Sequence, residues 1–313
     1  MNNKLNTCDA NKVFFIVVVL NLVYFVSIRV LELFNANFIS TNFYLILIIN
    51  QFYFTLFPVL LYLIKNKINI KKELGFNRLD VSFSILIILI SIPAYIGTSS
   101  FNAVVLGVLQ SMGYKFDSVH IPPQNTGGFI LSVLVVAVSP AICEEVLHRG
   151  ILLRSYEKEG STRSILISAL LFGLFHFDFK NLLGPIFFGV LIGYYVVRTD
   201  SIFSGMLAHF INNLIAIITQ YFASDFIGMN EEKIINLEHI LILMIVGVLC
   251  FLVMIGLLIC FHRMTKQKCR TIPPKINIIT DTISTMRHWP IFSVLILYVL
   301  HTVVFLAISI LHN

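Results

Sequence analysis

The chain has 313 residues, of which 58% are apolar and only 12% are charged, and its mean hydropathy is +0.89. Since a soluble domain usually carries about 25% charged residues, this composition excludes an ordinary soluble protein and predicts a polytopic membrane protein. The formal net charge is only +6, so we interpret the basic residues as signals of membrane orientation and expect no nucleic-acid partner. The five scattered cysteines form no C-x-x-C pair and indicate neither a disulfide framework nor a thiolate zinc site.

Apolar runs separated by short polar segments predict an all-α transmembrane bundle with about eight or nine membrane helices. We expect these helices at residues 13–33, 43–64, 81–109, 129–153, 164–177, 184–197, from about 201 onward, at 239–260 and at 290–311. The runs 164–177 and 184–197 have 14 residues each, fewer than the roughly 20 that cross a bilayer as a helix. This pair is therefore expected to be tilted or partly re-entrant.

Basic residues gather on one side of the predicted bundle. The segments 65–78, 154–163 and 263–275 are rich in Lys and Arg, and alternation of the helices puts them on the same side as the N-terminus. By the positive-inside rule, this pattern predicts an integral membrane protein with a cytoplasmic N-terminus.

Two adjacent glutamates, Glu144 and Glu145, interrupt the apolar run at 129–153, and His148 and Arg149 follow them. A charge at the centre of a bilayer costs about 3 kcal/mol on insertion scales, so such groups must form pairs or face a wet cavity. Glu145 and Arg149 are four residues apart on one helix face and are predicted to form an ion pair, which leaves Glu144 free for chemistry. We expect His148 to be solvated near the inner membrane surface.

Two later apolar helices carry further polar side chains. His176 lies in one of them, and His209 and Asn213 share a face of the other, with Gly205 one turn earlier to let a neighbouring helix approach. A glutamate and a histidine that converge on one water can activate it, while a second histidine and an amide can donate hydrogen bonds to an oxyanion. Together with Glu144, these residues predict hydrolysis of a peptide bond.

The same side chains also permit a metal site. Glu144, His176 and His209 would give the two-histidine, one-carboxylate ligand set of a divalent metal such as zinc, although an H-E-x-x-H motif is absent. We favour a mechanism without a metal, because the sequence offers no further carboxylate to orient these histidines.

Three motifs follow one another in the order and rough separation that are typical of one protein family. They are Glu144-Glu145-x-x-x-Arg149, Phe172-x-x-x-His176 and His209-x-x-x-Asn213. Over residues 129–222 the chain therefore resembles the CAAX-protease and bacteriocin-processing family, also called CPBP or Abi proteins, some of which have been described as metalloproteases. The resemblance implies an intramembrane endopeptidase with a catalytic core at residues 129–223, between N-terminal transmembrane helices at 1–128 and C-terminal ones at 224–313.

The resemblance also implies roles for the motif residues. Glu144 and His176 would activate water, His209 and Asn213 would form the oxyanion hole, and Glu145 and Arg149 would support the site. The implied substrate is a peptide or membrane protein in the lipid bilayer of a prokaryotic cell, similar to a prenylated protein, a pheromone or a bacteriocin.

Two other functions fit a bundle of this kind. One is a non-catalytic bacteriocin-immunity or scaffold protein of the same fold, although pure binding does not require the complete set of catalytic residue types. The other is a transporter with a proton-relay glutamate, which predicts an internal repeat that the sequence lacks.

Overall fold

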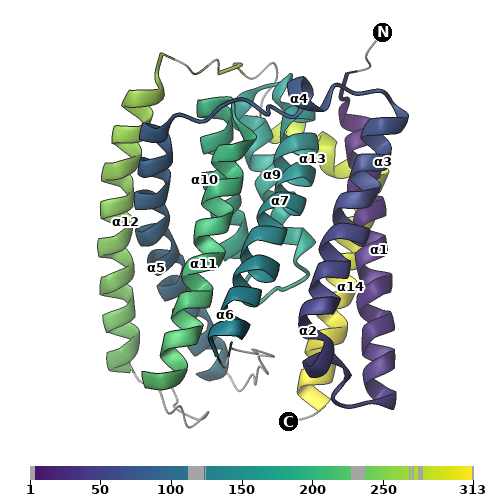
Figure 1. The fold of residues 1–313 in the computed structure, drawn as a ribbon, viewed down its shortest axis with the longest axis vertical. Helices are drawn as coiled ribbons and strands as arrows, with labels where there is room; N and C mark the ends of the chain where they lie inside the picture. The colour runs from purple at the N-terminus through teal and green to yellow at the C-terminus, as the bar shows by residue number, and fades with distance from the viewer. Residues whose placement is uncertain are drawn as a thin grey trace.

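The computed structural model describes residues 4–111, 123, 125–226, 237–267, 269, 271–273 and 278–311. Within these ranges the chain forms helices and no strand, which confirms the predicted all-α bundle (Figure 1). In the part of the chain that the structure describes, seven helical stretches are long and apolar enough to cross a membrane, and two shorter apolar helices lie between the fourth and the fifth of them. All nine expected helices are thus present.

Five of the seven long stretches are single helices and two are composite. The single helices are α1 (Thr7–Phe34), α5 (Val81–Ser111), α11 (Ile202–Phe226), α12 (Leu237–Thr265) and α14 (Trp289–Leu311). The first composite helix joins α2 (Phe38–Ile49), the π-helical η1 (Asn50–Leu56) and α3 (Phe57–Lys65). The second joins α6 (Thr126–Ser132), the π-helical η2 (Val133–Val138), α7 (Ser139–Glu145), the π-helical η3 (Val146–Leu153) and α8 (Arg154–Glu157).

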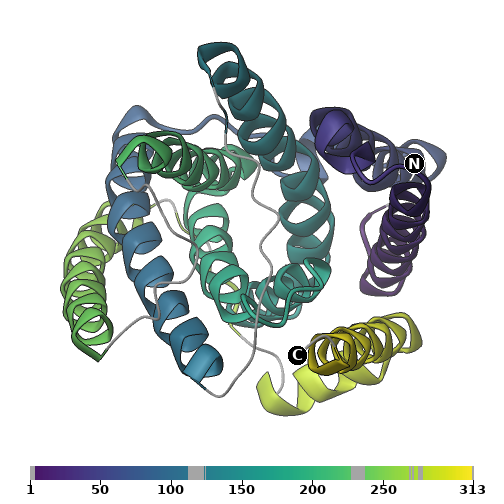
Figure 2. The same cartoon turned by 90° about the horizontal axis from the view of Figure 1, so that it is seen from below.

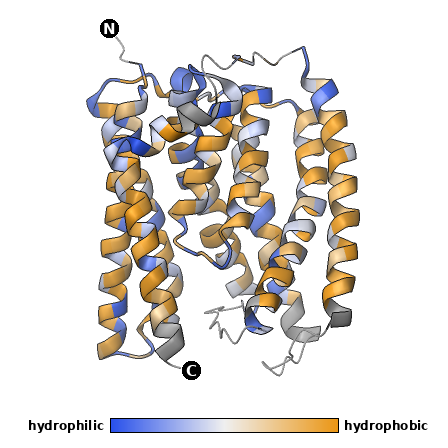
Figure 3. Cartoon of the chain, turned by 180° about the vertical axis from the view of Figure 1, so that it is seen from behind, coloured by the Kyte–Doolittle hydropathy of each residue, from blue (hydrophilic) through white to orange (hydrophobic). Residues whose placement is uncertain are grey.

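The short helices α9 (Ser161–Phe175) and α10 (Leu183–Thr199) form a hairpin whose connection lies inside the bundle (Figure 3). Glycine lets the two helices approach closely, because a Cβ atom on Gly189 would lie 2.8 Å from the Cα atom of Ala169. The two short runs thus form a closely packed pair of helices that turns back inside the bundle.

Two hydrophobic clusters flank the centre of the bundle. One joins α1, α3, η3, α9 and α14, and the other joins α5, α10 and α12. Seen along the bundle, the early purple and late yellow helices lie on one side and α5 and α12 on the other, with α9, α10 and α11 between them (Figure 2). The helices with the polar motif residues are therefore held between two apolar layers.

One end of the bundle, here called the basic end, carries α4 (Ile70–Glu73), α13 (Ile278–Arg287) and the start of α1 (Figure 1). Its described basic residues are Lys4, Lys12, Lys65, Lys67, Lys71, Lys72, Arg78, Arg154, Lys158, Arg163, Arg198, Arg263, Lys266 and Arg287. Several of them join separate elements. Arg154 Nη2 lies 2.8 Å from Asp200 Oδ1, and Arg198 Nε donates to Thr265 Oγ1 at 2.8 Å. The basic end is therefore cross-linked by arginines.

The π-helical segment η1 ends at Leu56, two residues before Pro58. Proline has no N–H, so the carbonyl four residues earlier, that of Phe54, loses its usual helical partner. Asn21 Nδ2 from α1 donates to this carbonyl at 3.3 Å. The irregular helix is thus stabilised by a side chain from its neighbour.

Candidate active site

An ion pair lies at the centre of the site. Arg149 Nη1 donates to Glu145 Oε1 at 2.9 Å, in the i,i+4 arrangement expected from the sequence, and both side chains are fully buried. The guanidinium carbon also lies 4.5 Å from the centroid of the Phe172 ring, within the range of a cation–π contact. A buried pair is costly to separate, because either partner alone would be an uncompensated charge.

Glu145 also binds the histidine of the next long helix. His209 Nδ1 lies 2.9 Å from Glu145 Oε1, and since a carboxylate accepts, the ring nitrogen is the donor. Gly205 allows this approach, because a Cβ atom there would lie 2.8 Å from Glu145 Oε2 and 3.0 Å from Ile192 Cγ2. Glu145 therefore joins α7 to α11 and fixes the ring of His209.

The close approach at Gly205 gives a direct prediction. Gly205→Ala is expected to lower the melting temperature in detergent, because overpacking of this kind costs typically about 1–3 kcal/mol. Gly256→Ala in α12 is the matched control, since a Cβ atom there meets nothing within 4 Å. The control should gain stability by up to about 1 kcal/mol from helix propensity. Equal changes in the two variants would show that Gly205 is not needed for the packing of Glu145.

Glu144 has a partner that the sequence analysis missed. Gln51 Nε2, from η1, donates to Glu144 Oε1 at 2.8 Å, and both residues are less than a tenth exposed. Glu144 Oε2 and Gln51 Oε1 are buried and have no hydrogen-bond partner among the described residues. The only sequence signal for Gln51 was an amide within an apolar run, but π-helical segments such as η1 often occur at functional sites.

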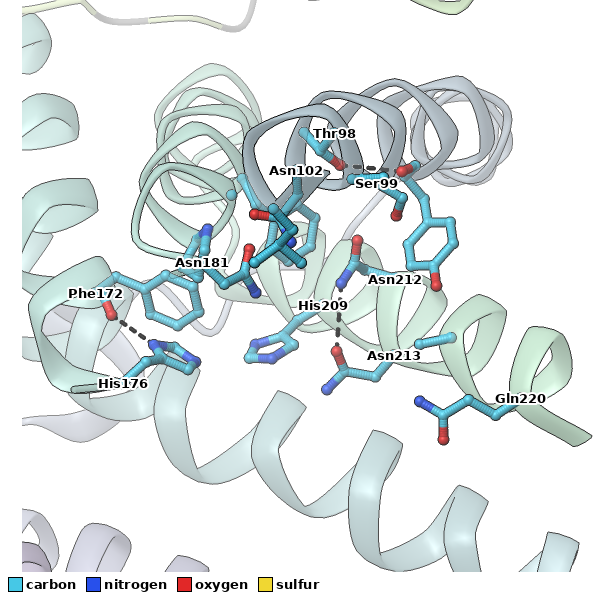
Figure 4. Close-up of a pocket in the computed structure, with 17 residues that line it drawn as sticks. Thr98, Ser99, Asn102, Phe172, His176, Asn181, His209, Asn212, Asn213 and Gln220 are labelled. Atoms are coloured by element: carbon cyan, nitrogen blue, oxygen red, sulfur yellow. Dashed lines mark hydrogen bonds between the residues drawn. The ribbon is translucent and has the colours of Figure 1, made fainter. Parts of the chain in front are cut away.

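His176 and Asn213 are each oriented by a backbone carbonyl. His176 follows α9, and its Nδ1–H donates to Phe172 O at 2.8 Å (Figure 4). Asn213 Nδ2 donates to Val136 O at 3.0 Å. This carbonyl lies four residues before Pro140, which has no N–H to offer it. A proline in one helix thus provides the acceptor that holds the amide of another.

Two cavities meet at these residues. One, of about 170 Å³, is lined by Glu144, Gln51, His176, His209 and Asn213 together with four apolar residues. The other, of about 490 Å³, shares His176, His209 and Asn213 with the first. The four residues that the family resemblance assigned to water activation and oxyanion binding therefore border one cavity.

His148 is not solvated, contrary to our expectation. Its side chain is fully buried, and Nδ1 donates to Glu144 O at 2.9 Å. The ring makes edge-on contacts with Phe14, Phe172 and Phe175, at centroid distances of 5.9, 5.0 and 5.2 Å. The expectation was wrong because α1 and α9 pack over η3 and cover this position.

The alternative ligand set of Glu144, His176 and His209 does not assemble as a metal centre. Among the residues that the structure describes, no three His, Cys, Asp or Glu side chains come together in a group that could hold a metal ion. Glu144 is hydrogen-bonded to Gln51, and His209 donates to Glu145, so the structure does provide a carboxylate that orients this histidine, contrary to the sequence analysis. Since Glu144, His176 and His209 do not form such a group, no chemical step is assigned to a metal below.

Comparisons with known proteins agree with the motif pattern. Residues 126–215 match the family described as "Type II CAAX prenyl endopeptidase Rce1-like". The chain is also 28% identical over 122 residues to "Putative membrane peptidase YdiL" of Bacillus subtilis (strain 168), which covers 36% of this chain and 50% of that protein. The chain thus matches about half the length of this curated relative. No solved structure matches the chain significantly. The matched residues include Glu144, His176, His209 and Asn213 of the smaller cavity, but not Gln51.

Proposed function

We propose, from the premise that this chain is a member of the CAAX-protease family, that it is an intramembrane endopeptidase in which Glu144 and His176 activate the attacking water. The observation that carries the proposal is the cavity of about 170 Å³, where Glu144 meets His176, His209 and Asn213. The three motifs belong to separate parts of the chain, and a purely structural role would not require them to border one space.

The proposed activation of water follows from the hydrogen bonds of His176 and Glu144. Because His176 Nδ1–H donates to Phe172 O, the neutral ring presents Nε2 as an acceptor. Glu144 is the second acceptor, so one water can give a hydrogen bond to each and direct a lone pair at a carbonyl carbon. Glu144 takes a proton from the water as the new C–O bond forms. The same proton then passes to the leaving amide nitrogen as the C–N bond breaks.

Oxyanion binding is proposed for His209 and Asn213. Asn213 Nδ2 carries two hydrogens, and the bond to Val136 O uses one of them, so the other is free to donate. His209 already donates from Nδ1 to Glu145, so Nε2 donates only when the ring carries both protons. Glu145 is then the adjacent counter-ion. Donors fixed in this way before the reaction stabilise a developing negative charge without reorganisation.

The substrate class follows from the family resemblance. We propose a peptide or membrane-protein segment that reaches the site within the bilayer, such as a prenylated-protein-like, pheromone or bacteriocin-type peptide. The decisive experiment uses purified protein in detergent micelles, a peptide library and mass spectrometry of the products, with Glu144→Ala as the control. Cleavage by the wild type but not by Glu144→Ala supports the proposal. Peptide binding without cleavage would favour the non-catalytic scaffold.

Gln51 gives a prediction about this mechanism. Gln51→Leu is expected to lower kcat about 10- to 100-fold with little change in KM, because a hydrogen bond to a charged group contributes about 1.5–3 kcal/mol. Tyr53→Leu is the matched control, because Tyr53 is 68% exposed on the same helix, and this variant should leave kcat unchanged. Steady-state kinetics on one cleaved peptide provide the measurement. A rise in KM alone would assign Gln51 to substrate binding instead.

The metal question has its own test. Because the mechanism above assigns no step to a metal, prolonged chelation is expected to leave the cleavage rate unchanged. Elemental analysis of the active protein should accompany the assay. One tightly held metal per chain, lost together with activity and restored with it, would replace this mechanism with a metal-dependent one.

A further inference from the structure

The orientation of the bundle in a membrane follows from its charges. The described Lys and Arg residues lie mostly at the basic end, whereas Arg29 lies near the opposite end of α1 and pairs with Glu32 at 2.7 Å. Cytoplasmic loops carry the excess of Lys and Arg in membrane proteins. The basic end is therefore assigned to the cytoplasmic face.

The larger cavity extends from the catalytic residues away from the basic end. Its walls include Tyr95 to Leu106 of α5 and His209 to Gln220 of α11. Both helices start at the basic end and run to the opposite one (Figure 1), so the later wall residues, such as Asn102 and Gln220, lie in the half of the bundle away from the basic end. The α9–α10 hairpin enters from the basic end and contributes Phe172 and Phe188 to the wall. The hairpin thus lies between the cavity and the basic end.

The lining of this cavity is polar but uncharged apart from its two histidines. Its other polar residues are Tyr95, Thr98, Ser99, Asn102, Asn181, Asn212, Asn213 and Gln220, and the described lining includes no Asp, Glu, Lys or Arg. Figure 4 shows the amides of Asn102, Asn181 and Asn212 arranged around His209. Carboxamides both donate and accept, as the main chain of a peptide does. A charged side chain entering here would meet no Asp, Glu, Lys or Arg in the described lining and would be costly to bury.

An extended peptide segment needs such partners. Within a bilayer every backbone N–H and C=O must find a hydrogen-bonding partner inside the protein, and an extended segment has none of its own. The cavity of about 490 Å³ lies within the range of roughly 300–1,000 Å³ for ligand sites and shares His176, His209 and Asn213 with the catalytic cavity. A peptide bound in it would therefore lead directly to the proposed nucleophile.

We propose that this cavity admits an uncharged, extended peptide segment from the face opposite the basic end, so that the substrate is presented on the extracytoplasmic side. The part of this inference that concerns cleavage of the bound peptide rests on the proposed peptidase function. The side of access rests only on the charge distribution and the position of the cavity.

Cysteine labelling in intact cells tests the side of access. Asn102→Cys, Gln220→Cys and, at the basic end, Lys71→Cys are made in a background without the five native cysteines that keeps the wild-type melting temperature. A membrane-impermeant thiol reagent is expected to label the first two in intact cells, and Lys71→Cys only after permeabilisation. Labelling of the cavity positions only after permeabilisation, or of Lys71→Cys in intact cells, would overturn the proposed side.

Protection from labelling tests the chemistry of the occupant. In purified protein that carries Asn102→Cys with Glu144→Gln, an uncharged peptide is expected to slow labelling several-fold, and the same peptide with one Lys or Glu inserted should not. Equal protection by both peptides, or by neither, would overturn the proposed occupant. Protection by an uncharged peptide that the wild type never cleaves would leave this inference standing and contradict the peptidase function. Cleavage of the peptide by the wild type, together with labelling of the cavity positions only after permeabilisation, would support the peptidase function and contradict the proposed side of access.

Discussion

Glu144→Gln is expected to lower kcat for peptide cleavage by about 100- to 10,000-fold, the range that a positioned general base contributes. The glutamine side chain has nearly the same shape and still offers an oxygen to Gln51 Nε2, which donates to Glu144 at 2.8 Å in the wild type. It cannot take a proton from water. The fold should therefore persist while the chemistry stops.

Steady-state kinetics and a melting curve in the same detergent check this expectation. The matched control is Glu157→Gln on the same composite helix, where the carboxylate pairs with Arg154 at 2.8 Å outside the site. This control should cleave at the wild-type rate. If Glu144→Gln also cleaves at the wild-type rate, another group must remove the proton from water.

The membrane helices follow from the sequence because the bilayer imposes strong local rules. A helix that crosses hydrocarbon needs a long apolar run, and every apolar run of the chain became a helix. The ion pair between Glu145 and Arg149 was equally local, since i,i+4 spacing alone puts the two side chains on one face. The α9–α10 hairpin could also be anticipated, because its runs were too short to cross.

Other features depend on contacts between distant segments. Gln51 meets Glu144 across 93 positions of sequence, so no local pattern pairs them. His148 stands near the end of an apolar run, and only the packing of α1 and α9 over η3 shows that it is buried. The π-helical segments also depend in part on tertiary contacts. A side chain of another helix donates to the carbonyl that Pro58 or Pro140 leaves without a partner.

The second large effect is expected at Arg149. Arg149→Met should destabilise the protein by about 3–5 kcal/mol, because it removes the cation that pairs with the buried Glu145 carboxylate and leaves that carboxylate only the hydrogen bond from His209. Both side chains are fully buried in the wild type, and methionine restores much of the lost volume without the charge. Unfolding in detergent measures the loss. The exposed pair of Arg29 and Glu32 provides the control, since Arg29→Met should cost no more than about 1 kcal/mol.

A double variant separates the structural role of this pair from its role at His209. Glu145→Gln combined with Arg149→Met removes both charges, and stability should return toward the wild type, because an uncharged replacement for a buried pair is often neutral. Activity should not return, since His209 Nδ1 then faces an amide where it had a carboxylate at 2.9 Å. The proposed imidazolium would lose its counter-ion. A double variant that regains stability and full cleavage together would show that Glu145 and Arg149 hold the helices together and do not position the oxyanion donor.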